Sequence, residues 1–157
     1  PPRVGLAPFE RVVEDHGRAL LSFCAAQVGP GGADDCFQET MLAALRSYGQ
    51  LRDPRAIRAW LFSIAARKAI DAHRASARAP TPSGELDEQA GAEDTSTGDE
   101  ALWERVGALP EKQRQAVILR YRADLTHREI AQVMQISEPA ARRNVFEGLK
   151  QLRAARA

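Results

Sequence analysis

The stretch from residue 80 to residue 101 constrains the fold of this chain more than any other feature of the sequence. It contains seven acidic residues, no basic or aromatic residue, and a single large aliphatic side chain, Leu86. Such a composition cannot bury enough apolar surface to offset the entropy lost on ordering. The sequence therefore predicts a flexible acidic linker at 80–101 between two small domains, 1–79 and 102–157, with a solvated loop of no consequence as the alternative.

The formal net charge of +1 hides an uneven distribution. Residues 1–79 carry 11 basic and 8 acidic side chains, and residues 102–157 carry 11 basic and 6 acidic ones. The first and second domains thus have net charges of +3 and +5, and the stretch between them has a net charge of −7. Taken alone the near-zero total argues against a nucleic-acid partner, whereas two basic domains separated by an acidic tether are compatible with one.

The first domain shows helical periodicity throughout, and no segment alternates with period two for long enough to form a strand. One helix is expected to end at Gly29-Pro30, a second to begin near Ala33, and a third to follow the Asp53-Pro54 pair, a cap with proline at the first helical position. The residues expected on the buried sides of these three helices are, in order, Phe9, Val12, Val13, His16, Leu20 and Phe23; Phe37, Met41, Ala44, Leu45 and Tyr48; and Ile57, Trp60, Leu61 and Ile64.

The second domain is also predicted to be helical, which makes the fold class all-α. Thr126 and Glu129 have the spacing of a capping box at the start of a short helix, and Ser137 is a suitable cap for a longer one. The longer helix should bury Ala141, Val145, Leu149 and Leu152 and expose Arg142, Arg143, Asn144 and Lys150. A short capped helix, a tight turn and a longer basic helix form a helix-turn-helix pattern.

Catalysis and metal binding are poorly supported by the sequence. The three histidines, His16, His73 and His127, are scattered, and Cys24 and Cys36 lie twelve residues apart on different predicted helices. Zinc sites need closely spaced ligand pairs, so the two cysteines are interpreted as small buried apolar side chains. No glycine-rich phosphate loop is present. We therefore expect no enzyme activity, no cofactor and no metal.

The location expected from the sequence is the cytoplasm. No apolar run approaches the length of a membrane span, and the N-terminus lacks a signal-peptide pattern. Small secreted proteins are usually stabilised by several disulfides, and two cysteines can form only one. The cysteine count therefore favours a reducing compartment. We expect no membrane insertion.

Nucleic-acid binding is better supported. In the terminal helix, arginine can bind guanine with two hydrogen bonds, asparagine can pair with adenine, and lysine commonly contacts phosphates. A second basic surface is expected along the third helix, where Trp60 and Phe62 accompany several basic residues, namely Arg67, Lys68, Arg74 and Arg78. Aromatic rings beside cations suit unstacked single-stranded bases, although Trp60 fits the core stripe of its helix equally well.

Four segments resemble bacterial sigma factors in order and spacing. The run Asp34-Asp35-Cys36-Phe37-Gln38-Glu39-Thr40 is similar to their D-D-x-x-Q-E-T segment. The run from Trp60 to Ala65, followed by Ala69-Ile70-Asp71 and Arg74, is similar to their W-L-x-x-I-A-x-x-x-A-x-D-x-x-R segment. Leu109-Pro110-Glu111 with Arg114, and Thr126 with Glu129-Ile130-Ala131, resemble the start of their C-terminal domain. The chain is identified as similar to the small extracytoplasmic-function (ECF, group IV) type of the sigma-70 family, which keeps only domains two and four.

This resemblance implies a promoter-specificity subunit that binds core RNA polymerase, recognises the −10 and −35 promoter elements and promotes DNA melting. Its partners would be the β′ coiled coil and the β flap of the polymerase, double- and single-stranded promoter DNA, and an anti-sigma protein. The polymerase-binding residues would be Asp35, Gln38 and Glu39. The loop from about Gly49 to Arg58 and the third helix would bind the −10 element through Arg58, Trp60, Arg67, Lys68 and Arg74. The terminal helix would bind the −35 element through Arg142, Arg143, Asn144 and Lys150.

The chain also departs from the family pattern. It has Ile64-Ala65-Ala66-Arg67 where the family often has Ile-Ala-Arg-Asn, so the −10 specificity is not transferable. Asn144 replaces a customary arginine and Glu147 a later basic residue, which predicts a −35 contact that is either weakened or altered in its specificity. Two other functions stay open: a stand-alone helix-turn-helix regulator, and a sigma-like adaptor that binds polymerase without directing transcription.

Overall fold

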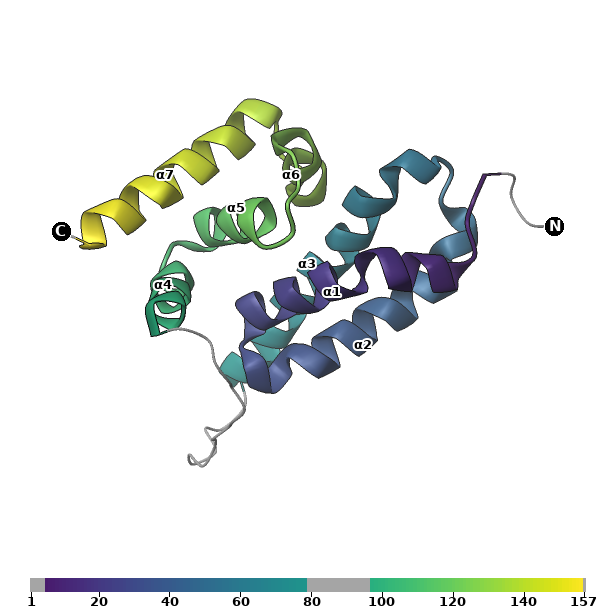
Figure 1. Ribbon diagram of the computed structural model, residues 1–157, viewed down its shortest axis with the longest axis horizontal. Helices are drawn as coiled ribbons and strands as arrows, with labels where there is room; N and C mark the ends of the chain where they lie inside the picture. The colour runs from purple at the N-terminus through teal and green to yellow at the C-terminus, as the bar shows by residue number, and fades with distance from the viewer. Residues whose placement is uncertain (1–4, 79–96, 157) are drawn as a thin grey trace.

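The computed structural model describes residues 5–78 and 97–156, and all regular elements within these ranges are helices (Figure 1). This confirms the all-α prediction. The first unit consists of α1 (Phe9–Val28), α2 (Pro30–Ser47), the 3-10 turns η1 (Tyr48–Gln50) and η2 (Pro54–Ala56), and α3 (Ile57–Arg78). The second consists of α4 (Thr97–Gly107), α5 (Glu111–Tyr121), α6 (His127–Met134) and α7 (Glu138–Arg156). Most of the predicted linker lies outside the described residues, and its last part, 97–101, lies in α4.

The turn between α1 and α2 is tighter than the sequence suggested. Gly29 has φ +85°, a left-handed value that glycine adopts without strain, and its N–H donates to the carbonyl of Ala25 at the end of α1. Pro30 follows at the first position of α2, where its fixed φ suits a helix start. The prediction that α2 begins near Ala33 was therefore wrong by about one turn.

The core of the first unit is built on a pair of phenylalanine rings. Phe23 of α1 and Phe62 of α3 are almost fully buried, with ring centroids 5.6 Å apart in an edge-on arrangement. Leu20 and Leu61 complete the centre of this core. Phe62 was expected beside the basic residues of the third helix as part of a nucleic-acid surface. That expectation was wrong, because Phe62 lies on the side of α3 that faces α1.

The buried side of α2 also differs from its predicted stripe. Small side chains line it, namely Ala33, Cys36, Thr40 and Ala44, whereas Phe37 and Met41 are only half-buried. Leu45, predicted to be buried, is 54% exposed. The physical reason is that α2 contacts both α1 and α3, so that its most central positions hold small residues and its longer apolar side chains lie toward the edge.

The helix-turn-helix segment forms as predicted. The Thr126 hydroxyl accepts the N–H of Glu129 at 3.1 Å, and the Glu129 carboxylate accepts the N–H of Thr126 at 2.9 Å, which completes the capping box of α6. Gln135 ends α6 in a left-handed conformation with φ +59°. Ser137 accepts the N–H of Ala140 at 3.2 Å and so caps the start of α7.

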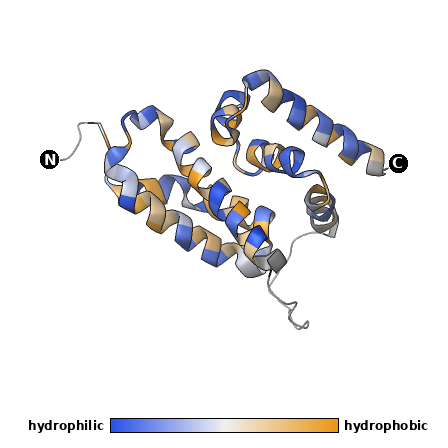
Figure 2. Ribbon diagram, turned by 180° about the vertical axis from the view of Figure 1, so that it is seen from behind, coloured by the Kyte–Doolittle hydropathy of each residue, from blue (hydrophilic) through white to orange (hydrophobic). Residues whose placement is uncertain are grey.

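The two units pack against each other, and one cluster of buried apolar residues continues through both. Helix α3 contacts α6, and α1 contacts α5 (Figure 1). Helix α7 lies on the outside of the second unit, where it packs on α5 and α6. Figure 2 shows mostly hydrophilic residues along this outer helix. The arrangement leaves the outer faces of α2 and α7 uncovered.

Candidate functional surfaces

The first candidate surface is the outer face of α2. The predicted polymerase-binding residues Asp35, Gln38 and Glu39 are all exposed on it. Leu42 and Leu45 follow at helical spacing on the same side and are 52% and 54% exposed. The face therefore combines carboxylates, an amide and two aliphatic side chains, and the structure brings the three predicted residues together. The exposed leucines were not predicted as part of this surface.

The second candidate surface follows α3. Trp60, Arg67 and Arg74 lie on one side of this helix, because their spacings are close to whole helical turns. Trp60 is half-buried against the ring of Tyr48, with centroids 6.2 Å apart, while the two arginines are exposed. Lys68 is half-buried. Four of the five residues predicted to contact the −10 element therefore lie along α3, between Trp60 and Arg74.

The fifth predicted residue, Arg58, is in the first turn of α3, but its side chain contacts the second unit. Its Nη2 donates to the backbone carbonyl of Asp124 and, at 3.5 Å, to that of Ala123 in the turn between α5 and α6. The same atom lies 3.7 Å from a carboxylate oxygen of Glu129. Arg58 therefore joins the start of α3 to the capping box of α6. In this arrangement its guanidinium is engaged by protein groups.

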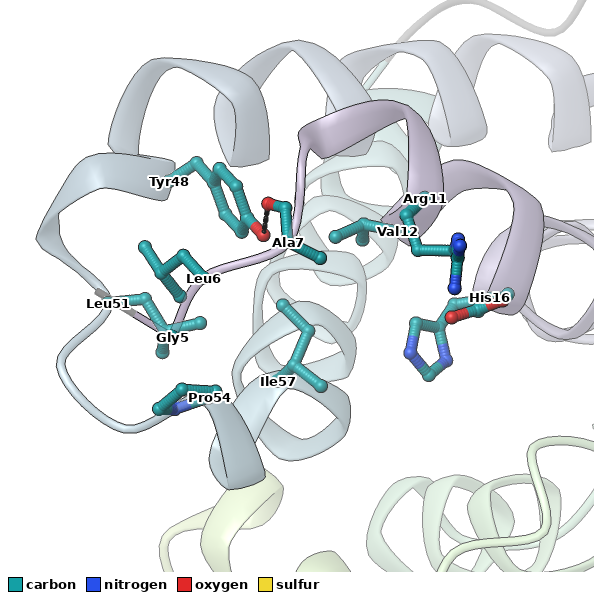
Figure 3. A pocket seen from close by; sticks show the side chains of 11 residues that line it. Gly5, Leu6, Ala7, Arg11, Val12, His16, Tyr48, Leu51, Pro54 and Ile57 are labelled. Carbon is teal, nitrogen blue, oxygen red and sulfur yellow. Dashed lines mark hydrogen bonds between the residues drawn. The ribbon is translucent and has the colours of Figure 1, made fainter. Parts of the chain in front are cut away.

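A small pocket opens beside the loop that precedes α3 (Figure 3). It has a volume of about 110 Å³ and lies between the segment Gly5–Ala7, the first turns of α1, and the turns that contain Leu51 and Pro54. The Tyr48 hydroxyl donates to the carbonyl of Ala7 and holds that segment against the loop. At its other end lies His16, whose pKa is lowered from its usual value chiefly by burial. The pocket thus adjoins the loop expected to bind the −10 element.

The third candidate surface is the outer face of α7. Arg142, Arg143 and Lys150 are exposed on it, as predicted. Arg142 pairs with Glu138 one turn earlier at 2.9 Å. The side-chain amide of Asn144 donates to the carbonyl of Ala140 at 3.1 Å, so in this structure the Asn144 amide hydrogen is directed at its own helix.

One exposed aromatic residue and one contact between the units were not predicted from the sequence. Phe146 is 58% exposed on α7, and its position off the Val145 and Leu149 stripe is the signal that could have identified it. Arg122 donates to the Ser22 hydroxyl at 2.6 Å, and its guanidinium lies 4.3 Å from the ring centre of Trp103. No sequence signal identifies that contact, because it joins α1 to the second unit across the fold.

The described residues show no sign of a metal site or a membrane span. Among them, no group of three His, Cys, Asp or Glu side chains is placed to hold a metal ion. None of the helices described is long and apolar enough to cross a bilayer. Cys24 and Cys36 are free and buried, in agreement with their interpretation as buried side chains.

Comparisons with known proteins agree with this geometry. Residues 12–79 match the family model "Sigma-70 region 2", and residues 99–152 match "Sigma-70, region 4". The ECF RNA polymerase sigma factor ShbA of Streptomyces griseus is 32% identical over 85% of this chain and 80% of its own length. The ECF RNA polymerase sigma factor SigD of Mycobacterium tuberculosis is 32% identical over 92% of this chain and 75% of its own length.

Two solved structures share the fold. One is CnrH in complex with the cytosolic domain of CnrY, with a TM-score of 0.71, 22% identity, and coverage of 94% of this chain and 86% of that chain. The other is the sigma factor RpoE of Bartonella quintana in complex with the anti-sigma factor NepR, with a TM-score of 0.78, 18% identity, and coverage of 93% and 94%. Because two sigma-70 models match in order and relatives at 32% identity span most of the chain, this chain belongs to the sigma-70 family, as an ECF sigma factor that recognises promoters for RNA polymerase.

Proposed function

We propose that this sigma factor divides its contacts between two domains, region 2 at 1–79 and region 4 at 102–157, joined by the acidic stretch 80–101. Region 2 binds core RNA polymerase and the −10 element, and region 4 binds the −35 element and the β flap of the polymerase. The observation that carries this proposal is the separation of three exposed faces, on α2, α3 and α7, over two helical units.

The outer face of α2 is the proposed polymerase contact. Leu42 and Leu45 supply apolar area that a partner helix can bury, and Gln38 and Glu39 supply hydrogen-bonding groups beside it. An apolar centre with polar neighbours is typical of a protein–protein interface. The partner would be the β′ coiled coil, and Asp35 would lie at one end of the contact.

Helix α3 is the proposed −10 contact. Exposed Arg67 and Arg74 can bind phosphates, and the half-buried Trp60 presents part of an aromatic ring near them. Lys68 adds a further cation. Arg58 would join this set only after it leaves the carbonyls of Ala123 and Asp124.

Helix α7 is the proposed −35 contact. It follows a capped helix and a tight turn, and its outer face carries Arg142, Arg143 and Lys150. Such a helix enters the major groove, where arginine can form two hydrogen bonds with guanine. Asn144 would contact a base after its amide leaves the carbonyl of Ala140.

An anti-sigma protein is a further proposed partner. The two solved structures reported above are complexes, one with the anti-sigma factor NepR and one with the cytosolic domain of CnrY. For this chain we also propose a cytoplasmic location and a binding role without enzymatic activity, as expected of a sigma factor.

Two experiments test the proposed function. In the first, the full chain is mixed with core RNA polymerase at physiological salt, and we expect a stable complex; a stand-alone helix-turn-helix regulator would not form one. In the second, run-off transcription is measured on promoters mapped after induced expression. We expect transcripts that depend on the chain. Polymerase binding without such transcripts would identify a sigma-like adaptor instead.

A further inference from the structure

The two cysteines of this chain lie in one small cluster. Cys24 of α1 and Cys36 of α2 are 0% and 4% exposed, and they pack with Ala33 of α2 and Ala69 of α3. The side chains at this crossing are small, so the helices approach closely and bring the two thiols together. The two thiols are near enough for a hydrogen bond from Cys24 to Cys36 to shift the pKa of both. Their contact lies in the interior, beneath residues of the α2 and α3 surfaces described above.

The two thiols are not equivalent. The hydrogen bond from Cys24 is the main cause that holds the pKa of Cys36 below its usual value, and Thr40 and Lys68 act in the same direction against burial and Glu39. The pKa of the Cys24 thiol is raised, first by that hydrogen bond and then by burial. Cys36 is also the less completely buried of the two. A thiol with greater thiolate character and some exposure is the one that oxidants attack first.

We propose that Cys24 and Cys36 form a reversible oxidation site, which peroxide converts into a disulfide between α1 and α2. The Cys36 thiolate attacks one oxygen of hydrogen peroxide, the O–O bond breaks, and Cys36 becomes a sulfenic acid while the other oxygen leaves and is protonated to water. The Cys24 thiol then loses its proton and attacks the Cys36 sulfur. The S–S bond forms, the S–O bond breaks, and hydroxide leaves with that proton as water. Overall, two thiols lose two electrons and two protons, and one peroxide becomes two waters.

The disulfide would have a defined effect on the fold. It would join α1 to α2 across the turn at Gly29, and both cysteines already belong to one packed cluster. A cross-link that matches native geometry stabilises mainly by restricting the unfolded chain. We therefore expect the oxidised chain to melt about 5–10 °C above the reduced chain.

Mass spectrometry of the full chain tests the site directly. No lysine or arginine lies between Arg18 and Arg46, so a single tryptic peptide carries both cysteines. After treatment of the folded, reduced chain with hydrogen peroxide, we expect this peptide to lose the mass of two hydrogen atoms and to regain it with dithiothreitol. Fragment spectra of this peptide distinguish its two cysteines from Met41, which peroxide can also oxidise. Two unchanged cysteines, a cysteine that gains oxygen atoms without a disulfide, or a disulfide between two chains would each overturn the proposal. So would a melting temperature that falls on oxidation.

Single substitutions test the order of attack. In Cys24→Ser, a hydroxyl can still donate to the Cys36 sulfur but cannot form the disulfide, so we expect the sulfenic acid of Cys36 to accumulate and to be trapped by dimedone. In Cys36→Ala we expect at least tenfold less trapping at Cys24, since burial alone still raises the pKa of this thiol and shields it from reagents. Equal trapping in the two variants would overturn the assigned order. The wild-type mass measurement holds even where a variant folds poorly.

Discussion

At the scale of single residues, the clearest surface to test is the outer face of α2. Gln38 and Glu39 are exposed and contribute little to the core, so Gln38→Ala and Glu39→Ala should leave stability within about 0.5 kcal/mol of the wild type. Each should weaken polymerase binding by about 1–2 kcal/mol, or roughly 5- to 30-fold. Binding is measured by titration with labelled core enzyme. Lys112→Ala, an exposed change on α5, is the matched control, and equal affinities for all three variants would refute the interface.

The two arginines at the start of α7 allow a comparison of base and phosphate contacts. Arg142 is held by Glu138, whereas Arg143 makes no hydrogen bond or ion pair within the described part of the chain. If Arg143 binds a guanine, Arg143→Ala should cost about 1–3 kcal/mol on the preferred −35 duplex and much less on a duplex changed at that base. Competition binding with the two duplexes measures the difference. A uniform loss on both would assign Arg143 to a phosphate.

His16 gives the fold a predictable response to pH. Burial is the main cause of its lowered pKa, with a further contribution from the Arg58 charge, while Asp15 acts in the opposite direction. The folded chain thus binds fewer protons at His16 than the unfolded chain does. The stability from this group is complete above the unfolded pKa, about 6.5, and is lost as the pH falls through the lower folded pKa. Between about pH 7.5 and 5, the melting temperature of His16→Gln should fall less than that of the wild type; parallel curves would contradict this.

At the scale of elements, the contact between α5 and α7 depends on one small residue. A methyl group added at Gly148 would lie 2.7 Å from a methyl carbon of Val117 and 3.5 Å from the carbonyl of Gln113. Helices packed this closely cannot accommodate a side chain without moving apart. We expect Gly148→Ala to destabilise region 4 by about 1–3 kcal/mol in urea unfolding, whereas Gly107→Ala, which meets no atom within 4 Å, should have a much smaller effect.

The starts of the helices could be predicted from the sequence more accurately than their buried faces. Thr126, Glu129 and Ser137 mark α6 and α7 correctly, because capping depends on residues only three positions apart. The stripe of α2 was placed one residue away from its buried side, and Phe62 was placed on the wrong face of α3. Periodicity defines a face of a helix, but when a helix contacts two neighbours its most buried positions depend on how they are arranged around it. The predicted exposure of Asp35, Gln38 and Glu39 on α2 agrees with the structure, as does that of three residues on α7, namely Arg142, Arg143 and Lys150. Asn144, also predicted to be exposed, is half-buried because its amide bonds to the carbonyl of Ala140 in its own helix. The roles of all these residues remain predictions.

At the scale of the whole molecule, the two units are held together by arginines whose partners are distant in sequence. Arg58 of α3 contacts the turn that contains Asp124, and Arg122 of the second unit contacts Ser22. Contacts between residues so far apart in the chain leave no local pattern in the sequence. From the sequence, Arg58 was therefore predicted to contact DNA and not the second unit. On the proposal that each unit binds its own promoter element, units that pack so closely would separate when both elements are bound. The structure would then correspond to a closed form.

Weakening the Arg58 contact should open this form. Arg58→Ala removes two hydrogen bonds and an ion pair between the units, so we expect a larger radius of gyration by small-angle X-ray scattering. Arg52→Ala, an exposed change in the loop before α3, is the control and should leave the radius unchanged. If Arg58→Ala scatters as the wild type does, the apolar contacts alone hold the units together.

The position of Glu129 has a consequence for counterions. Its carboxylate caps α6 and also faces Arg58, so the closed chain neutralises within itself a cation that DNA would otherwise neutralise. Each phosphate contact releases about one condensed ion and adds about one to the slope of log affinity against log salt concentration. Glu129→Gln keeps a side chain that can cap the helix but removes the negative charge that competes for Arg58. The salt slope of DNA binding by Glu129→Gln should therefore be steeper than that of the wild type, with Arg58 supplying the difference.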